Sequence, residues 1–188
     1  MKTKRTNKTT VDPSKLKPFS DDDETVNVIV ETPMGSRNKF KYDEDNGIYT
    51  LATILPQGMS FPAAFGFVPS TEAEDGDPED ILVLMDEPVF TGCLVPSRLI
   101  GVIEAEQTED GETTRNDRLI GVAAKSRDHS DIKRVSDLND NTLHEIEQFF
   151  VSYNREQGKK FKVLACKGPK AALKLLQKRI KAREKKAA

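Results

Sequence analysis

The chain has 188 residues, of which 36% are hydrophobic and 32% are charged, and its formal net charge is −2. This length suits one domain with a buried core, and no apolar run approaches the ~20 residues that a membrane-spanning helix needs. The first residues lack the apolar stretch of a secretory signal, and Cys93 and Cys166 suit a reducing compartment. We therefore expect a cytoplasmic protein without a membrane segment.

The small net charge conceals a strong segregation of charge along the chain. Residues 1–18 carry six Lys and Arg against one Asp, and residues 159–188 carry twelve against one Glu. The 11 basic and 29 acidic residues between them leave residues 19–158 with 18 excess negative charges. A nucleic-acid-binding domain usually has a basic body. We therefore do not expect nucleic acid as a partner of this acidic body, whose charge favours bound cations instead.

The first two thirds of the chain predict a small β-barrel. Residues 1–24 are rich in Lys, Thr, Asp and Pro without periodicity, and we expect a flexible tail there, followed by a single domain over residues 25–188. Asp45-Asn46-Gly47 is typical of a β-hairpin, and a polar loop is expected over Thr108–Asp117. Short strands separated by turns about every 8–12 residues are typical of a mostly antiparallel barrel. The predicted strands are Val26–Thr32, Lys39–Asp43, Ile48–Leu55, Phe61–Pro69, Ile81–Asp86, Arg98–Gln107 and Arg118–Ala124.

The last third of the chain changes to helical periodicity. Apolar residues recur at helical spacing over residues 142–157 and predict a helix there, with Thr142 and Glu145 as its capping box. A final strand is expected at Lys160–Cys166, and Pro169 predicts the first turn of a second helix. The inner side of this second helix is predicted to consist of Ala172, Leu175, Leu176, Arg179 and Ile180.

The stretch Glu74–Asp80 gathers five carboxylates around Gly76 and Pro78 and leads into an apolar strand. Like charges this close repel and raise one another's pKa unless cations lie among them. Magnesium is usually held by one or two carboxylates together with the phosphates of a substrate. The stretch therefore indicates a magnesium-phosphate site, although a solvated acidic loop explains the stretch equally well on its own.

The motif Asp75-Gly76-Asp77-Pro78-Glu79-Asp80, with the strand after it, is similar to the Asp-Gly-Asp-Pro-x-Asp signature of the soluble magnesium-dependent inorganic pyrophosphatases. The resemblance extends from Val26 to the C-terminal helix. Supporting motifs follow in the family's order: Glu31-Thr32-Pro33, Gly35-Ser36-Arg37-Asn38-Lys39, Phe61-Pro62, Phe65-Gly66-Phe67, Phe149-Phe150 and Tyr153.

This resemblance implies a fold, a reaction and partners. The implied fold is mainly β with α, a five-stranded OB-like β-barrel flanked by two C-terminal helices. The implied reaction is hydrolysis of inorganic diphosphate to two phosphates by a water molecule that several Mg²⁺ ions activate, with Mn²⁺ able to substitute. Diphosphate is then the substrate, and a homo-oligomer is expected because family members usually form one.

The resemblance also implies roles for individual residues. Asp77 matches the general base that accepts a proton from the attacking water. The residues at metal-ligand positions are Asp75, Asp80, Glu31 and either Asn116 or its neighbour Asp117. The residues that match phosphate-binding groups are Lys39, Arg118 and Tyr153.

Several site positions depart from the family pattern. Asn116 stands where an aspartate is usual, and the adjacent Asp117 would point to the opposite face of a strand. Loss of one oriented electrostatic contact costs on the order of 10²–10³ in rate, so we expect reduced activity. The other departures are Lys41 for a glutamate, Thr53 for an arginine, Phe65 for a tyrosine, Glu79 for an apolar residue, Thr108 for an aspartate and Asn154 for a lysine.

Three functions remain open at this point. The first is inorganic diphosphate hydrolysis, and the second is hydrolysis of another phosphoanhydride. The third is a binding module that engages phosphate compounds, a protein partner or nucleic acid through its basic ends. The triplet Asp75, Asp77 and Asp80 favours hydrolysis, because binding alone would not require it.

Overall fold

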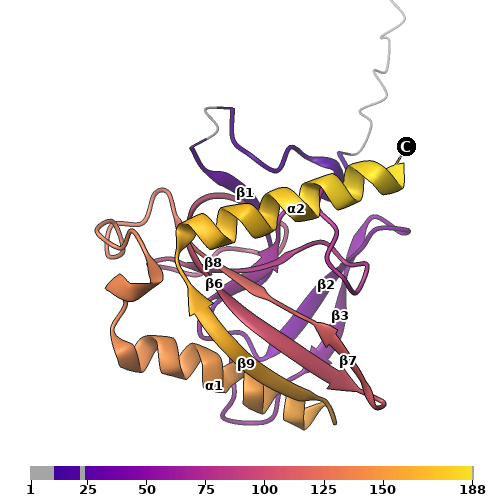
Figure 1. Ribbon diagram of the computed structural model, residues 1–188, viewed down its shortest axis with the longest axis vertical. Coiled ribbons are helices and arrows are strands. Elements are labelled where there is room, and N and C mark those ends of the chain that lie inside the picture. Colours follow the sequence, from indigo (N-terminus) through magenta and orange to yellow (C-terminus); the bar gives the residue numbers. More distant parts are fainter. Residues whose placement is uncertain (1–10, 22–23, 188) are drawn as a thin grey trace, which may run out of the picture.

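The computed structural model describes residues 11–21 and 24–187 (Figure 1). Five strands form a closed ring in the order β1–β4–β5–β8–β6, and β6 pairs again with β1. Every neighbouring pair in the ring is antiparallel except β5 and β8, which run parallel. The predicted mainly β fold around a five-stranded barrel is thus confirmed. The strands of the ring are β1 (Val26–Thr32), β4 (Ala64–Phe67), β5 (Asp80–Leu84), β6 (Leu94–Glu109) and β8 (Arg118–Ala123).

Strand β6 is the longest and extends beyond the ring. Its C-terminal half pairs with β9 (Lys160–Lys167) on one side and with β7 (Glu112–Arg115) on the other. Strand β7 lies inside the polar loop predicted over Thr108–Asp117, so that prediction is wrong. The reversal takes place at Asp110 and Gly111, which both have positive φ, and an Asp-Gly pair is well suited to a tight hairpin.

Strands β2 (Asn38–Asp43) and β3 (Ile48–Ile54) form a separate two-stranded sheet. The Asp43 carboxylate accepts a hydrogen bond from the Asn46 N–H at 3.0 Å, and Gly47 has a φ of +67°. These features close the turn at the predicted Asp-Asn-Gly sequence, and they confirm the predicted hairpin.

Helix α1 (Asp140–Glu156) begins earlier than the sequence pattern predicts. Its N-cap is Asn139, whose side chain accepts a hydrogen bond from the Asn141 N–H at 2.9 Å. The capping box predicted from Thr142 and Glu145 is therefore wrong, because both residues already lie inside the helix. A short 3-10 helix, η2, precedes α1 at Val135–Asp137.

Helix α2 (Pro169–Ala187) begins at the predicted proline, and Figure 1 shows α1 and α2 on different sides of the strands. One part of the core lies between the ring and α1 and includes Phe61 and Phe150, which are fully buried. The other lies beneath α2, where Ala172 and Leu176 pack against buried residues of the ring. Each helix is therefore fixed by burial of one apolar side.

Part of the predicted N-terminal tail packs against the ring. A 3-10 helix, η1 (Pro13–Lys15), buries Ser14, whose carbonyl oxygen accepts a hydrogen bond from the Ser70 N–H at 2.9 Å. Phe19 forms an isolated bridge with Val26, the first residue of β1. For residues 11–21 the structure therefore corrects the predicted flexible tail, whereas residues 1–10 and 22–23 lie outside the described part of the chain.

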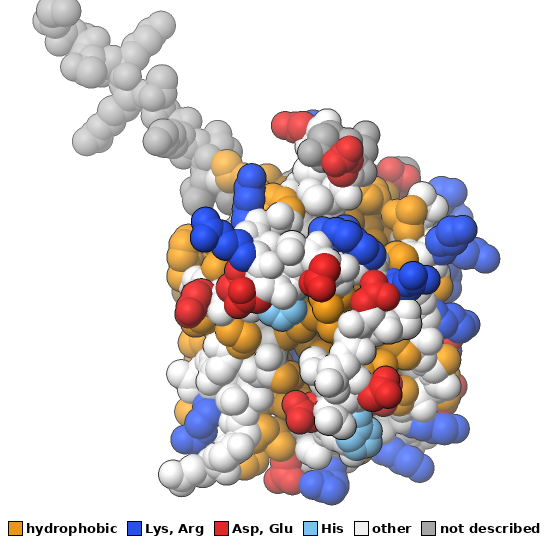
Figure 2. Space-filling model, turned by 90° about the vertical axis from the view of Figure 1, so that its left-hand side faces the viewer, with side chains coloured by type: hydrophobic (Ala, Val, Ile, Leu, Met, Phe, Trp, Pro, Cys, Tyr) orange, Lys and Arg blue, Asp and Glu red, His pale blue; other side chains and the backbone are white. Residues whose placement is uncertain are grey.

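Charges of both signs mix on the surface of the folded protein. The face in Figure 2 carries Lys and Arg side chains interspersed with Asp and Glu. The segregation along the sequence is partly cancelled because the basic helix α2 contacts acidic loops. In the described residues, no helix is both long enough and apolar enough to cross a membrane. The ion pairs of α2 with these loops include Lys178–Glu74, Arg183–Glu44 and Lys186–Glu72.

Candidate active site

The acidic turn, residues 74–80, connects β4 to β5 and is closed by its own backbone. The Ala73 N–H donates to the Asp77 carbonyl oxygen at 2.8 Å. Gly76 has a φ of +88°, a conformation that glycine adopts at little cost. The Asp77 N–H donates to Oδ1 of Asp75 at 3.2 Å, which holds the two aspartates beside each other.

A cavity of about 490 Å³ opens beside the acidic turn. Four of the predicted site residues line it, and they come from four different segments: Glu31 from β1, Lys39 from β2, Asp77 from the turn and Asp80 from the start of β5. The fold thus brings together carboxylates and a cation that are distant in the sequence. Other residues around the cavity are Lys41, Tyr42, Phe65, Phe67, Arg183 and Lys186.

Two aspartates of the site hold protein cations. Nζ of Lys41 lies 2.7 Å from Oδ2 of Asp77, and the two side chains are 51% and 53% exposed. Nη1 of Arg118 lies 2.8 Å from Oδ2 of Asp80, and it also donates to Oδ1 of Asn116. Arg118 is buried, so its ion pair is far less solvated than that of Lys41.

Burial changes the ionisation of two carboxyl groups. Glu31 is 6% exposed, and its Oε1 accepts a hydrogen bond from the Tyr42 N–H at 2.7 Å. Desolvation, together with the negative charge of Asp80, raises the pKa of Glu31 to about 7 against this hydrogen bond. Desolvation also raises the pKa of Asp80, although Arg118 and Lys39 oppose the shift. A cation that enters the site would favour the ionised form of both groups.

The ammonium group of Lys39 lies over an aromatic wall, which consists of Phe65, Phe149 and Tyr153. Nζ of Lys39 lies 5.2 Å from the ring centroid of Tyr153 and 5.6 Å from that of Phe65. Tyr153 is on α1 and stacks on Phe149 with ring centroids 5.8 Å apart. The wall therefore fixes the position of the tyrosine and lies within cation–π distance of the lysine.

The structure separates Asn116 from Asp117. The Asn116 side chain lies beside Arg118, as described above. Oδ1 of Asp117 instead accepts hydrogen bonds from Nε of Arg115 at 2.6 Å and from the Ala105 N–H at 3.0 Å, and its Oδ2 lies 4.0 Å from Nη2 of Arg179. Adjacent residues of an extended chain point in opposite directions, which explains the separation. Neither Asp117 nor Asn116 is among the residues that line the cavity, and the same holds for the predicted site residues Asp75, Arg118 and Tyr153.

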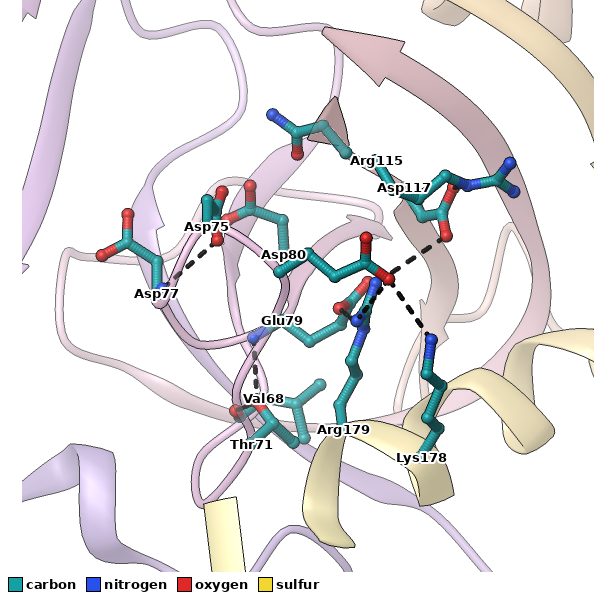
Figure 3. A network of polar contacts seen from close by, with 12 residues as sticks. Val68, Thr71, Asp75, Asp77, Glu79, Asp80, Arg115, Asp117, Lys178 and Arg179 are labelled. Atoms are coloured by element: carbon teal, nitrogen blue, oxygen red, sulfur yellow. Dashed lines mark hydrogen bonds and ion pairs between the residues drawn. The ribbon is translucent and has the colours of Figure 1, made fainter. Parts of the chain in front are cut away.

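Several residues of the site were not predicted as such. Lys41 was noted only as a departure from the family pattern, yet it binds Asp77. Arg179 was placed on the inner side of the second helix, and a charged residue on an apolar side is itself a signal of a buried partner. That partner is Glu79, as Figure 3 shows. Arg183 and Lys186 line the cavity without any local sequence signal.

The donor set suits a hard divalent cation such as Mg²⁺, because it consists of carboxylate oxygens. In residues 11–21 and 24–187, however, no three Asp, Glu, His or Cys side chains converge closely enough to hold an ion as they stand. Asp77 and Asp80 face Lys41 and Arg118 instead. Because the Lys41 side chain is half exposed, its ammonium group can leave Asp77 at little cost, which lowers the positive charge that an entering ion would meet.

A cavity that combines carboxylates with Lys and Arg side chains suits metal-assisted hydrolysis of phosphate compounds. The family model described as inorganic pyrophosphatase matches residues 28–184, and the chain belongs to this family.

Known relatives agree with this assignment. The chain is 36% identical over 156 residues to an inorganic pyrophosphatase of Synechocystis sp., which covers 83% of this chain and 90% of the relative. It is 37% identical over 151 residues to that of Geobacillus stearothermophilus, with coverage of 80% and 89%. Among solved structures, the inorganic pyrophosphatase of Thermus thermophilus matches with a TM-score of 0.84 and 32% identity, and it covers 93% of this chain and 99% of the relative. The Helicobacter pylori enzyme matches with a TM-score of 0.82 and 34% identity, with coverage of 90% and 99%.

Proposed function

We propose that the protein hydrolyses inorganic diphosphate to two phosphates by metal-activated water. One observation carries the proposal: in a chain of this family, Glu31, Lys39, Asp77 and Asp80 line a single cavity. The family membership and the retained acidic turn favour hydrolysis over a module that only binds. The proposed metal is Mg²⁺, with Mn²⁺ as a substitute, and we propose a homo-oligomer in the cytoplasm.

The carboxylates take two roles in this proposal. Asp77 is the general base, since its side chain is half exposed on the cavity and can reach an attacking water. Asp75, Asp80 and Glu31 hold the metal. Arg118 connects Asn116 to this group, because its Nη1 contacts both Oδ1 of Asn116 and Oδ2 of Asp80. Bound Mg²⁺ supplies charge neutralisation for the phosphates and lowers the pKa of a water ligand.

The cations and Tyr153 orient the phosphates in this proposal. Nη1 of Arg118 lies 2.8 Å from Asp80 at the edge of the cavity, and its buried Nε, which has no hydrogen-bond partner in the described residues, would reach a phosphate oxygen only after a shift of the side chain. Lys39 lies on the cavity and adds a mobile positive charge beside the hydroxyl-bearing ring of Tyr153. Together these groups compensate the negative charge that repels an attacking hydroxide.

Two of the sequence departures support a reduced rate. Thr53 is the cross-strand partner of Lys39, so the position beside this lysine lacks a second cation. The buried Asn154 side chain donates to the Phe150 carbonyl oxygen at 2.9 Å, so its amide is engaged within α1 and does not face the cavity. Because each missing contact to the phosphates costs up to about 10²–10³ in rate, turnover is expected to be slower than in a site that has cations at the positions of Thr53 and Asn154.

The proposal is tested by phosphate release from diphosphate with Mg²⁺, with Mn²⁺ and without metal. Asp77→Asn keeps the shape of the side chain and removes the base, so we expect a loss of about 10²-fold or more in kcat. Asp110→Asn, at the β6–β7 turn, is the matched control, because asparagine also tolerates its positive φ. Equal phosphate release by the wild type and Asp77→Asn would refute the proposed role of Asp77. Absence of metal-dependent release by the wild type would refute the activity itself.

A further inference from the structure

Arg179 of α2 is buried beneath the acidic turn and contacts three carboxylates. Its side chain is 4% exposed. Nε lies 2.9 Å from Oε2 of Glu79, Nη1 lies 3.2 Å from Oε1 of Glu74, and Nη2 lies 4.0 Å from Oδ2 of Asp117. Each nitrogen of the guanidinium group thus faces a different acidic side chain.

Two of these carboxylates flank the aspartates of the proposed site. Glu74 immediately precedes Asp75, and Glu79 immediately precedes Asp80. Figure 3 shows the turn with Asp75 and Asp77 on one side of Glu79 and the α2 side chains on the other. One guanidinium group therefore binds both ends of the acidic turn and fixes the distance between them.

Backbone contacts extend the same connection. The carbonyl oxygen of Arg179 accepts a hydrogen bond from the Glu72 N–H at 3.1 Å, just before the turn. The Glu79 N–H donates to Oγ1 of Thr71 at 2.8 Å, and its carbonyl oxygen accepts from the Val68 N–H at 3.0 Å. The turn is thus anchored to α2 and to the residues that follow β4, on both sides of the segment that carries Asp77.

Stability alone does not explain the Glu79–Arg179 pair. Glu79 is 1% exposed, and its Oε1 has no hydrogen-bond partner in the described residues. The desolvation of a buried ion pair often cancels the attraction between its charges, and an apolar pair of similar volume is usually as stable. In some proteins a buried pair of this kind serves to specify a geometry, and the geometry that this pair would specify is that of the acidic turn.

We propose that Arg179 is a positioning residue, which sets the spacing of the carboxylates on the acidic turn by binding Glu74 and Glu79 together. This inference rests on the proposed function. Arg179 does not touch the substrate or the metal, and it acts through the backbone on either side of Asp77. Residues that orient metal ligands from behind typically contribute about 10–100-fold to metal affinity or activity.

The test compares three variants. Glu79→Leu/Arg179→Met replaces the ion pair with an apolar pair and leaves Asp117 bound to Arg115. Arg179→Lys retains a charge for Glu79, but a single ammonium group cannot reproduce the fork of a guanidinium group across two carboxylates. Lys178→Met is the matched control, because Lys178 also binds Glu74, at 3.2 Å, but makes no contact with Glu79.

The readouts are the Mn²⁺ affinity by calorimetry, amide hydrogen exchange of residues 73–80, and kcat and KM for diphosphate at several Mg²⁺ concentrations. For the apolar double variant we expect Mn²⁺ affinity and kcat to fall by about 10–100-fold, with a smaller change in KM. Exchange of the turn amides should accelerate, while the thermal unfolding transition stays cooperative. Arg179→Lys should show an intermediate loss, and Lys178→Met should match the wild type.

Two results would overturn the inference. One is a double variant that folds and has the Mn²⁺ affinity and the amide exchange of the wild type. If the double variant does not fold, the same result in Arg179→Lys would overturn the inference. The other is an equal loss in Lys178→Met, because any cation near Glu74 would then suffice. If the wild type released no phosphate, the proposed activity would fail, while Mn²⁺ binding and amide exchange would still decide whether Arg179 positions the turn.

Discussion

At the scale of single residues, the carboxylates of the cavity differ in how firmly they hold their cations. The Lys41–Asp77 pair is half exposed, whereas the Arg118–Asp80 pair is largely buried. An exposed ion pair contributes only about 0.2–1 kcal/mol, because water screens both charges. Lys41 is therefore the cation that a divalent ion displaces most easily, because its positive charge competes with that of the ion beside the negative charge of Asp77.

Removal of this competitor should strengthen metal binding. Lys41→Met removes a positive charge from the cavity and leaves the charge of Asp77 without its 2.7 Å partner, so we expect the Kd for Mn²⁺ to fall by up to about fivefold, which corresponds to the energy of one exposed pair. Calorimetric titration with Mn²⁺ measures this change. Lys125→Met is the control, because Lys125 is an exposed lysine that does not line the cavity. Weaker Mn²⁺ binding in Lys41→Met would show that Lys41 supports the metal site rather than competing with it.

At the scale of elements, a single carboxylate closes the loop that follows β8. Asp86, just after β5, accepts hydrogen bonds from the Ser126 hydroxyl and from the Arg127 N–H at 2.7 Å. These bonds, led by that of Ser126, lower the pKa of Asp86 from 3.8 to about 2. Because the folded state binds this proton less tightly than the unfolded chain does, Asp86 stabilises the fold above about pH 4 and loses this effect as the pH falls towards 2.

The stability of Asp86→Asn should depend on pH in the corresponding way. We expect a lower free energy of unfolding than that of the wild type at about pH 7, and a difference that narrows as the pH falls below about 4. Urea unfolding at a series of pH values measures both quantities. Asp128→Asn, which changes an exposed carboxyl in the same loop, should remain close to the wild type. A difference between wild type and Asp86→Asn that is constant down to pH 2 would exclude ionisation of Asp86 as its cause.

The elements that could be predicted from the sequence are those with a local signal. Alternating apolar residues marked β1, Asp-Asn-Gly marked the β2–β3 hairpin, and Pro169 marked the start of α2. Elements fixed by distant contacts were missed or misjudged. The predicted strand Phe61–Pro69 shortens to β4 (Ala64–Phe67), because Pro62 and Pro69 have no N–H for a ladder. Residues 11–21 show no periodicity, yet Ser14 is buried.

The same distinction applies to the site. The acidic turn is a local sequence motif, so its carboxylates stood out from their spacing, and the family resemblance gave Asp75, Asp77 and Asp80 their expected roles. The partners of these residues lie far away in the chain: Lys41 is 36 positions from Asp77. Pairing at such separation depends on the ring and its register, which composition and periodicity do not specify.

At the scale of the whole molecule, helix α2 brings basic residues to the acidic body. Arg183 lies 3.2 Å from Glu44 and 3.6 Å from Glu72, and Lys186 lies 2.7 Å from Glu72. The body would otherwise repel itself, because residues 19–158 carry 18 excess negative charges. The contribution of α2 therefore has two parts, a general reduction of charge and specific ion pairs.

Two double variants with the same change in net charge separate these parts. Arg183→Met/Lys186→Met removes the three contacts above, so we expect the free energy of unfolding to fall by about 1–2 kcal/mol at low salt, since exposed pairs contribute up to about 1 kcal/mol each. Lys181→Met/Lys185→Met removes two cations of the same helix that have no carboxylate within 4.0 Å in the described residues. The free energy of unfolding should therefore fall less in this variant. In about 1 M NaCl the difference between the two variants should shrink, because salt screens exposed charges beyond a few ångströms. Equal losses in both variants at low salt would show that α2 stabilises the body through its overall charge, with no contribution from the particular pairs.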